Sequence, residues 1–285
     1  SDKYLKSFHD LIKHSKTKPL PLFYDREYLS NLRRDAHMFL KETAEAVIKQ
    51  YNPRVVACSS MFDNLIACVS FFELVKKLAP ETVTLLGGPN CQGEMGKATH
   101  KLFPSVDYVV SGYADHVIAP LCRKIITYGK NMPADEVPAQ VFAPVFRETG
   151  YIHSSENAES RNNINLHELP VPDYNDYFDK LNRSEGIRKV VLPGIPIESS
   201  RGCYWHKCKF CGLKQDFSYR KKNWEQVYHE IVTLNTEHNT KRFMFCDNDV
   251  PFNKLTGMLD KLTEDHRGIH MWAEIRADLK KEDMK

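Results

Sequence analysis

Residues 54 to 88 read RVVACSSMFDNLIACVSFFELVKKLAPETVTLLGG. Two short runs in this stretch, 55–57 and 83–86, are apolar and rich in β-branched residues, and the helix-length apolar segment 65–78 separates them. Short runs that are apolar throughout and end near Ser, Asn or Gly are typical of buried parallel strands. The pattern continues with a third run at 108–110 between the expected helices 95–103 and 117–128. The stretch therefore predicts an α/β domain with a doubly wound sheet.

The flanking sequence divides the chain into further parts. Residues 1 to about 50 carry apolar side chains at helical spacing and end before Asn52-Pro53, which predicts a helix. Residues 130–190 are interrupted by prolines and a polar run, so we expect a connector. A second alternation follows, with a strand beginning at 195–200, a helix over 224–236, a strand over 242–246, a helix over 254–263 and a strand over 270–273.

Composition excludes several classes of protein. The 285 residues are 42% apolar and 27% charged, which is the balance of a folded globular chain rather than a disordered one. The best apolar stretch, Leu65 to Phe72, is far shorter than the roughly 18 residues of a membrane-spanning helix. A formal net charge of +3 gives no support for nucleic-acid binding. We therefore expect neither a membrane nor a nucleic acid as partner.

Cysteine placement indicates a metal site. Of the eight cysteines, Cys203, Cys208 and Cys211 fall within nine residues, whereas Cys58, Cys68, Cys91 and Cys122 are scattered singly through apolar segments. Scattered thiols with one tight cluster indicate a reduced, cytoplasmic chain with a metal site rather than a disulfide framework.

Three thiolates on one short loop hold three corners of a metal centre and leave the fourth position open. A structural zinc site normally closes four ligands, so His206 or Cys246 would have to complete it, and this stays the alternative. An iron–sulfur cluster with one non-cysteine iron ligand explains the presence of three cysteines better than a zinc site does. Seven Lys or Arg against one Asp between Arg201 and Lys222 favour an anionic cluster, and a solvated basic loop is the alternative explanation of these charges.

Ligands of open α/β sheets bind beyond the carboxyl ends of the strands, which here are followed by the loops 59–64, 87–94 and 111–115. Neither G-x-G-x-x-G nor the Walker pattern occurs in the chain. The glycines of these loops either make tight turns or admit a bulky cofactor close to the backbone.

The cysteine segment and the motifs around it resemble a known family. A strand, a cysteine triplet ending in Cys208-x-Phe-Cys211 and a βα repeat resemble the radical S-adenosylmethionine (SAM) superfamily. Several motifs are similar to those of cobalamin-dependent radical SAM C-methyltransferases that act in peptide (RiPP) maturation: Glu198–Cys203, Phe210–Leu213, Tyr219–Lys222, Phe245–Asn248 and Glu274–Lys280 in the second half, and Leu86–Gly96, Val106–Gly112 and Leu169–Tyr177 in the first.

The chain also departs from the family pattern. Its first cysteine gap holds four residues where three are most common, and Tyr113-Ala114-Asp115 stands where the family usually has Glu-Gly-Glu. The D-x-H-x-x-G signature of a lower-axial histidine is absent, so the resemblance implies cobalamin without a protein histidine ligand.

The resemblance implies roles for individual residues. Cys203, Cys208 and Cys211 would ligate a [4Fe–4S] cluster whose fourth iron binds SAM. The implied SAM contacts are Phe210 at the adenine, Asp247 and Asn248 at the methionine part, and Glu274 and Arg276 at polar groups. The implied cobalamin contacts are Ser59, Ser60, Met61, Phe62, Asn64, Gly87, Gly88, Asn90, Glu94 and Gly112. Each SAM contact has a plain alternative: Phe210 as core, Asp247 as a strand-end cap, and Glu274 with Arg276 as a surface pair on one face of a strand.

The implied architecture is a Rossmann-like doubly wound cobalamin-binding domain over residues 1–145, a linker over 146–190, and the first part of a radical SAM partial (β/α) barrel over 191–285. The N-terminal strand of the first domain and the rest of the barrel are then missing, so we expect an internal portion of a longer enzyme or one half of a split one. No catalytic side chain can be named from the sequence.

The implied activity is methylation of an unactivated carbon in a peptide or small-molecule substrate. SAM cleavage at the cluster would supply a 5′-deoxyadenosyl radical, methylcobalamin would supply the methyl group, and a flavodoxin or ferredoxin would supply electrons. A cobalamin-dependent radical SAM enzyme that rearranges or contracts its substrate is one alternative. A non-catalytic zinc or iron–sulfur structural module is the other.

Overall fold

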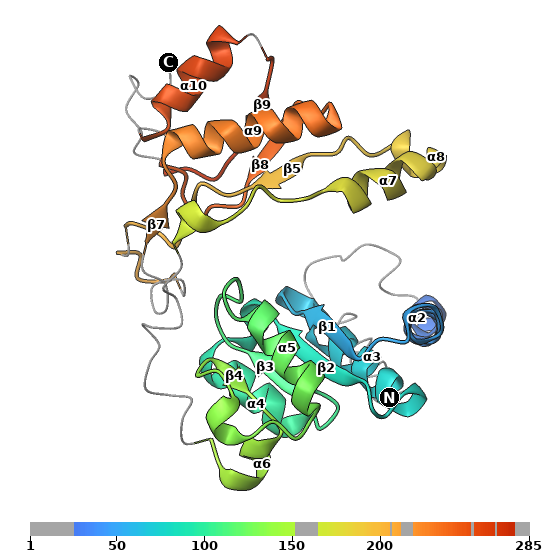
Figure 1. The fold of residues 1–285 in the computed structure, drawn as a ribbon. Coiled ribbons are helices and arrows are strands. Elements are labelled where there is room, and N and C mark those ends of the chain that lie inside the picture. The colour runs from blue at the N-terminus through green and yellow to red at the C-terminus, as the bar shows by residue number, and fades with distance from the viewer. Residues whose placement is uncertain are drawn as a thin grey trace. The chain divides into compact units, whose positions relative to one another are not determined.

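The computed structural model describes residues 26–151, 165–205, 207–211, 219–251, 254–265 and 267–276. The predicted helix before residue 26, the motif residues 212–213 and 277–280, and the alternative ligand His206 lie outside these residues. The chain divides into two compact units, Ser1–Arg161 and Asn162–Lys285, and both are mixed α/β structures (Figure 1). None of the helices in the described ranges combines the length and the apolar character needed to cross a membrane.

The first unit is built on a four-stranded sheet with the order β1-β2-β3-β4. β1 and β2 pair in parallel, as do β2 and β3, whereas β4 runs antiparallel to β3 at the edge. In chain order its main elements are α2 (Arg26–Tyr51), β1 (Val55–Ser59), α3 (Leu65–Leu78), β2 (Val83–Gly87), α4 (Gly93–Leu102), β3 (Tyr108–Val110), α5 (Ile118–Tyr128), β4 (Val141–Phe142) and α6 (Val145–Thr149). Three short 3-10 turns, η2 (Phe62–Asn64), η3 (Pro89–Cys91) and η4 (Ala134–Glu136), lie between them.

Helices cover both faces of this sheet. Leu86 and Val109 belong to a core with α3, whereas Leu85 and Val110 belong to a second core with α5. Four consecutive residues of β2 are buried, because a strand covered on both faces has no solvent side. The order of the described strands contains no reversal, so the doubly wound connection of the sheet stays a prediction.

Helix α2 is only half packed. Its C-terminal part contacts α3 and buries Ala44, with Val47 and Ile48 beside it. Leu32 and Phe39, farther towards its N-terminal end, are exposed. The apolar periodicity therefore predicted the helix correctly over the described residues 26–51, but it did not show which turns would be covered.

The expected connector contains regular structure. Pro133 and Pro144 precede the short helices η4 and α6, at the cap position where a proline interrupts no helical hydrogen bond. Met132, Val141 and Phe146 are buried in the α5 core. Residues 132–151 are therefore part of the first unit. Later in the same region lie η6 (Leu166–Glu168), α7 (Asn175–Arg183) and α8 (Glu185–Arg188).

The second unit contains a three-stranded parallel sheet with the order β5-β8-β9. Its elements are β5 (Ile195–Ile197), β6 (Ser200–Arg201), β7 (Arg220–Lys221), α9 (Trp224–His238), β8 (Arg242–Phe245), α10 (Thr256–Glu264) and β9 (His270–Trp272). β6 and β7 form a separate antiparallel pair. β9 ends one residue earlier than predicted and β8 ends before Cys246.

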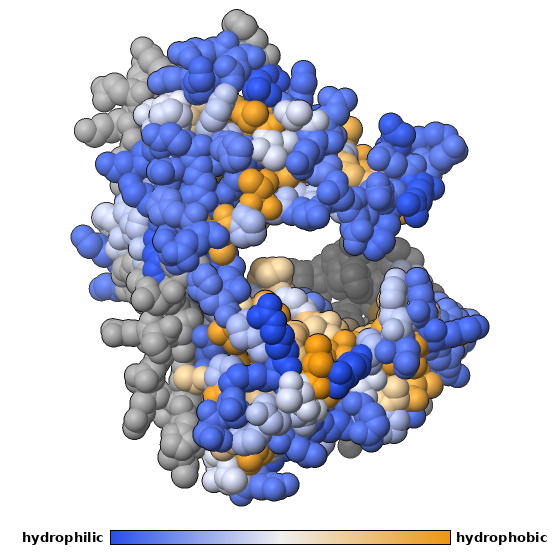
Figure 2. All heavy atoms as spheres, in the orientation of Figure 1, coloured by the Kyte–Doolittle hydropathy of each residue, from blue (hydrophilic) through white to orange (hydrophobic). Residues whose placement is uncertain are grey.

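One face of the β5–β8–β9 sheet packs against α9 and α10. Phe243 and Phe245 of β8 are buried in this core, whereas Met244 between them is exposed, as the alternation of side chains along a strand requires. The two helices pack closely at Gly257, where a Cβ atom would come within 2.8 Å of the Trp224 ring. In Figure 2 the visible surface is mostly hydrophilic, and apolar side chains reach it in scattered patches.

Candidate functional site

The first candidate site lies at the carboxyl ends of β1, β2 and β3, where hydrogen bonds join the first two loops. The Ser60 N–H donates to the Gly87 carbonyl at 2.7 Å, and the Asn90 N–H donates to the Ser60 carbonyl at 3.1 Å. The Asn90 side-chain amide also donates to the Ser60 hydroxyl at 3.0 Å. Ser60 is fully buried, so its polar groups bond within the loops. Ser60 and Asn90, both predicted cobalamin contacts, therefore act here as links between the two loops.

The β1 loop presents apolar side chains to solvent. Asn64 fixes its shape, because its side chain accepts from the Met61 N–H at 2.7 Å and donates to the Ser59 carbonyl at 3.2 Å. Phe62 has a φ of +52°, a region that bulky residues seldom occupy, and its carbonyl accepts from the Asn90 side chain at 2.9 Å. The Phe62 side chain is 80% exposed and Met61 is 49% exposed.

Glycine has two different roles in the β2 loop. Gly88 has a φ of +92°, and a Cβ atom there would lie 2.6 Å from the Ser60 carbonyl oxygen. Gly88 is therefore needed for the close approach of the two loops. A Cβ atom at Gly87 would meet nothing within 4 Å, so the backbone there borders open space.

A third loop, after β3, joins the same edge. The Ser111 hydroxyl accepts from the Gly93 N–H at 2.8 Å, and Gly112 follows with a φ of +88°. The Glu94 side chain is exposed and pairs with Lys97 at 3.3 Å. The sequence placed Ser111 in one of the candidate ligand loops but did not single it out as a contact. Sequence reasoning missed Met95, which is exposed on the first turn of α4.

Three cysteines lie in the core beneath this edge. Burial raises the pKa of Cys58 and of Cys91 to about 12, and it also raises the pKa of Cys68. Metal binding requires thiolates. These three side chains therefore stay neutral and behave as small apolar groups.

The second candidate site is the cysteine segment of the second unit. Cys203, Cys208 and Cys211 are free and half-buried, and the Cys211 N–H donates to the Cys208 carbonyl at 3.4 Å. Across the parts of the chain that the structure describes, no three His, Cys, Asp or Glu side chains are close enough to hold one metal ion. The donor set, three free thiols on one loop, has the right chemistry for a cluster. The thiols do not converge on one point in this conformation.

The predicted SAM contacts occupy different environments. Phe210 is 93% exposed, so the alternative that it belongs to the core is wrong. Asn248 and Glu274 are exposed as well. Asp247 is 3% exposed, and its carboxylate accepts from the Ser199 N–H at 3.0 Å, the Ser199 hydroxyl at 2.6 Å and the Ser200 hydroxyl at 2.7 Å. These bonds fit the alternative of a strand-end cap.

Arg276 contacts the cysteine segment. Its guanidinium carbon lies 3.7 Å from the centre of the Trp205 ring and 5.8 Å from that of Tyr204. The Lys207 ammonium group also lies over Trp205, at 4.7 Å. Cation–π contacts of this kind are attractive. Because β9 ends at Trp272, Glu274 and Arg276 follow the strand rather than sharing one of its faces.

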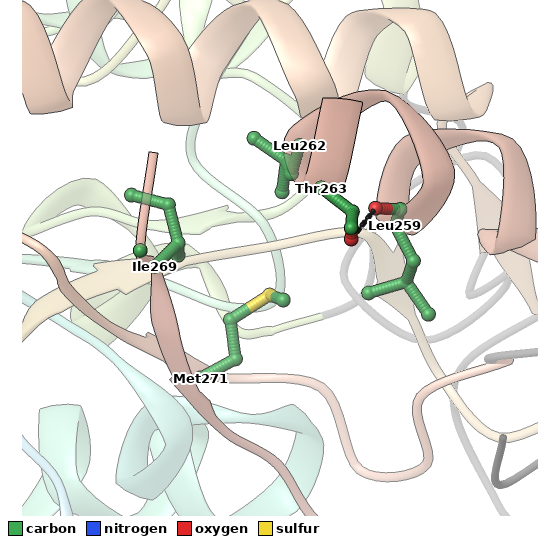
Figure 3. A pocket seen from close by; sticks show the side chains of 6 residues that line it. Leu259, Leu262, Thr263, Ile269 and Met271 are labelled. Atoms are coloured by element: carbon green, nitrogen blue, oxygen red, sulfur yellow. Dashed lines mark hydrogen bonds between the residues drawn. The ribbon is translucent and has the colours of Figure 1, made fainter. Parts of the chain in front are cut away.

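An apolar pocket of about 400 Å³ lies elsewhere in the second unit (Figure 3). α10 and the start of β9 form its walls, with the side chains of Leu259, Leu262, Thr263, Ile269 and Met271 and the backbone of Gly268. The Thr263 hydroxyl donates to the Leu259 carbonyl at 2.9 Å, and the lining includes no titratable side chain. The pocket contains none of the predicted site residues.

No known protein family matches the chain, and no curated protein does either.

Proposed function

We propose that the chain is part of a cobalamin-dependent radical SAM C-methyltransferase that acts on a peptide or small-molecule substrate. The observation that carries the proposal is the segment of three free, half-exposed cysteines that follows the parallel strand β5 and the short strand β6. Three unpaired thiols provide three ligands and leave a fourth position for a substrate or cofactor. In this proposal the second unit is the first part of a partial (β/α) barrel.

The open edge of the first unit supports a corrin site. Exposed Met61 and Phe62 give an apolar surface, and the open space at Gly87 lets a large ligand approach the backbone. A flat, mostly apolar macrocycle matches such a surface better than a small polar ligand does. In this proposal the first unit is a Rossmann-like cobalamin domain.

The chain's own residues would bind and orient the two cofactors. Cys203, Cys208 and Cys211 would hold the cluster, and the exposed Phe210 ring would stack on the adenine of SAM. When bound, the cluster with SAM supplies radical chemistry and methylcobalamin supplies the methyl group. We further propose a cytoplasmic location and a flavodoxin or ferredoxin as electron donor.

SAM cleavage tests the proposal. The protein, reconstituted anaerobically with iron and sulfide, is incubated with SAM and a reductant, and 5′-deoxyadenosine is measured. We expect Cys208→Ala to abolish the product and Cys122→Ala, a change to a free cysteine of α5, to leave it intact. Undiminished 5′-deoxyadenosine from Cys208→Ala would refute the ligand assignment. A substrate mass increase of about 14 units then separates methyl transfer from rearrangement or ring contraction.

A further inference from the structure

Both ends of the cysteine segment are fixed at one place, the loop base, which we define as Ser199, Ser200, Lys222, Glu230 and Asp247. β6 leads into the segment and β7 leads out of it, and the two strands pair directly, with Ser200 opposite Lys221 and Arg201 opposite Arg220. The Lys222 N–H also donates to the Ser199 carbonyl at 2.8 Å.

Asp247 fixes the incoming end. Its buried carboxylate accepts all three hydrogen bonds that Ser199 and Ser200 direct at it, and it lies two residues after β8, the neighbour of β5. A buried carboxylate that satisfies several donors is costly to remove, because the donors then lose their partner out of contact with water. Asp247 therefore couples the start of the cysteine segment to the central strand of the sheet.

A buried ion pair fixes the outgoing end. The Lys222 ammonium group lies 2.8 and 2.9 Å from the two carboxylate oxygens of Glu230 on α9, and both side chains are almost fully buried. Burial raises the pKa of Glu230, and the Lys222 charge opposes this effect. The pair therefore anchors β7 to the helix that covers the sheet.

An aromatic contact joins the two ends once more beyond the strands. The Tyr204 and Tyr219 rings meet edge to face with their centres 5.7 Å apart. Tyr204 follows Cys203, and Tyr219 precedes β7. The two ends are thus held together at three levels: the hydrogen bond from Lys222 to Ser199, the β6–β7 pairing and the tyrosine contact.

We infer that Asp247 is a positioning residue that, through Ser199 and Ser200, sets the place from which Cys203 joins Cys208 and Cys211 when the three thiols bind a common ligand. The inference rests on the proposed function for the cluster that the three thiols would hold, but its test needs neither that cluster nor SAM. Asp247 then acts on the thiols through the loop base rather than by contact with SAM. Cys203 lies two residues after β6, so a shift of β6 moves this thiol directly.

The test uses arsenite, which binds three thiolates at once and needs neither iron nor SAM. Full-length wild type, Asp247→Asn and Ser200→Ala are titrated with arsenite, and the thiols that remain reactive are counted. Asp260→Asn is the matched control, because Asp260 is an exposed carboxylate of α10. Hydrogen exchange of peptides from the loop base and α9 shows whether each variant is folded.

We expect wild type and Asp260→Asn to lose three reactive thiols on binding arsenite. Asp247→Asn should bind arsenite about tenfold more weakly, and the peptide that holds Ser199 and Ser200 should exchange faster while α9 stays protected, because one carboxylate oxygen becomes a donor that faces other donors. Ser200→Ala should lose affinity to a smaller extent. If Asp247→Asn disrupts α9, the arsenite affinity of Ser200→Ala alone tests the inference.

Equal arsenite affinity in wild type and in every folded loop-base variant would overturn the inference, and so would wild type that fails to engage three thiols. Iron–sulfur reconstitution is measured separately. If arsenite binding depends on Asp247 but the wild-type protein takes up no iron–sulfur cluster, the proposed function is refuted and the inference about the loop base still holds.

Discussion

Replacing Phe62 by alanine tests the corrin surface of the first unit. The side chain is 80% exposed in the ligand-free chain, so its loss should leave the fold stable to within about 0.5 kcal/mol. A phenylalanine has roughly 200 Å² of surface, which puts about 160 Å² in solvent. A planar ligand covers one face of the ring, or roughly 80 Å². At about 25 cal/mol per Å² this burial is worth about 2 kcal/mol.

Phe62→Ala should therefore bind cobalamin about 30-fold more weakly than the unaltered chain. The assay is titration of ligand-free protein with hydroxocobalamin, with free and bound corrinoid separated by ultrafiltration. Phe39→Ala is the matched control, because Phe39 is also exposed but lies on α2. Affinity within twofold of the unaltered chain for Phe62→Ala, or an equal loss in both variants, would show that the ring is not covered by the ligand.

Three further outcomes are expected. Gly88→Ala should weaken corrinoid binding and destabilise the first unit in urea, whereas Gly87→Ala, whose Cβ enters the open space proposed for the ligand, should weaken corrinoid binding without destabilising the unit. Burial, helped by the charge of Arg147, lowers the pKa of His100 from 6.5 to about 4. The unfolded chain then takes up a proton before the native one, so stability is full above pH 6.5 and falls by about 2 kcal/mol by pH 5, as hydrogen exchange of α4 in urea should show. Phe210→Ala should raise the KM for SAM without changing the iron content, because the exposed ring supports nothing in the fold.

The sequence predicted the regular parts of the fold because burial on both faces leaves a strong pattern. The bounds of α3 matched the expected helix 65–78, and β2 lies where the run 83–86 indicated a strand. β4 has only two residues and α6 only five, so neither carries a period that a sequence pattern can show. Prolines nearby indicated a connector, although Pro144 occupies the cap position of α6.

The sequence predicted where the candidate site at the ends of β1 and β2 lies, but not which of its polar groups bond to one another. Parallel strands bring the loops after β1 and β2 to one edge, so Ser60, Phe62 and Asn90 were expected together. Which polar groups bond to one another depends on loop geometry, and this is why Ser60 and Asn90 turned out to bond within the loops while Phe62 faces solvent. For the same reason Asp247 was expected to contact SAM, whereas its carboxylate accepts hydrogen bonds from Ser199 and Ser200.

We propose that one chain binds an iron–sulfur cluster through Cys203, Cys208 and Cys211 and a corrinoid at the β1–β2–β3 edge. The most direct measurement is metal and corrinoid analysis of protein purified without oxygen, together with its visible spectrum. We expect about four irons and one corrinoid per chain, with cluster absorbance at about 400 nm. Zinc in place of iron, with no such absorbance and no corrinoid, would contradict it.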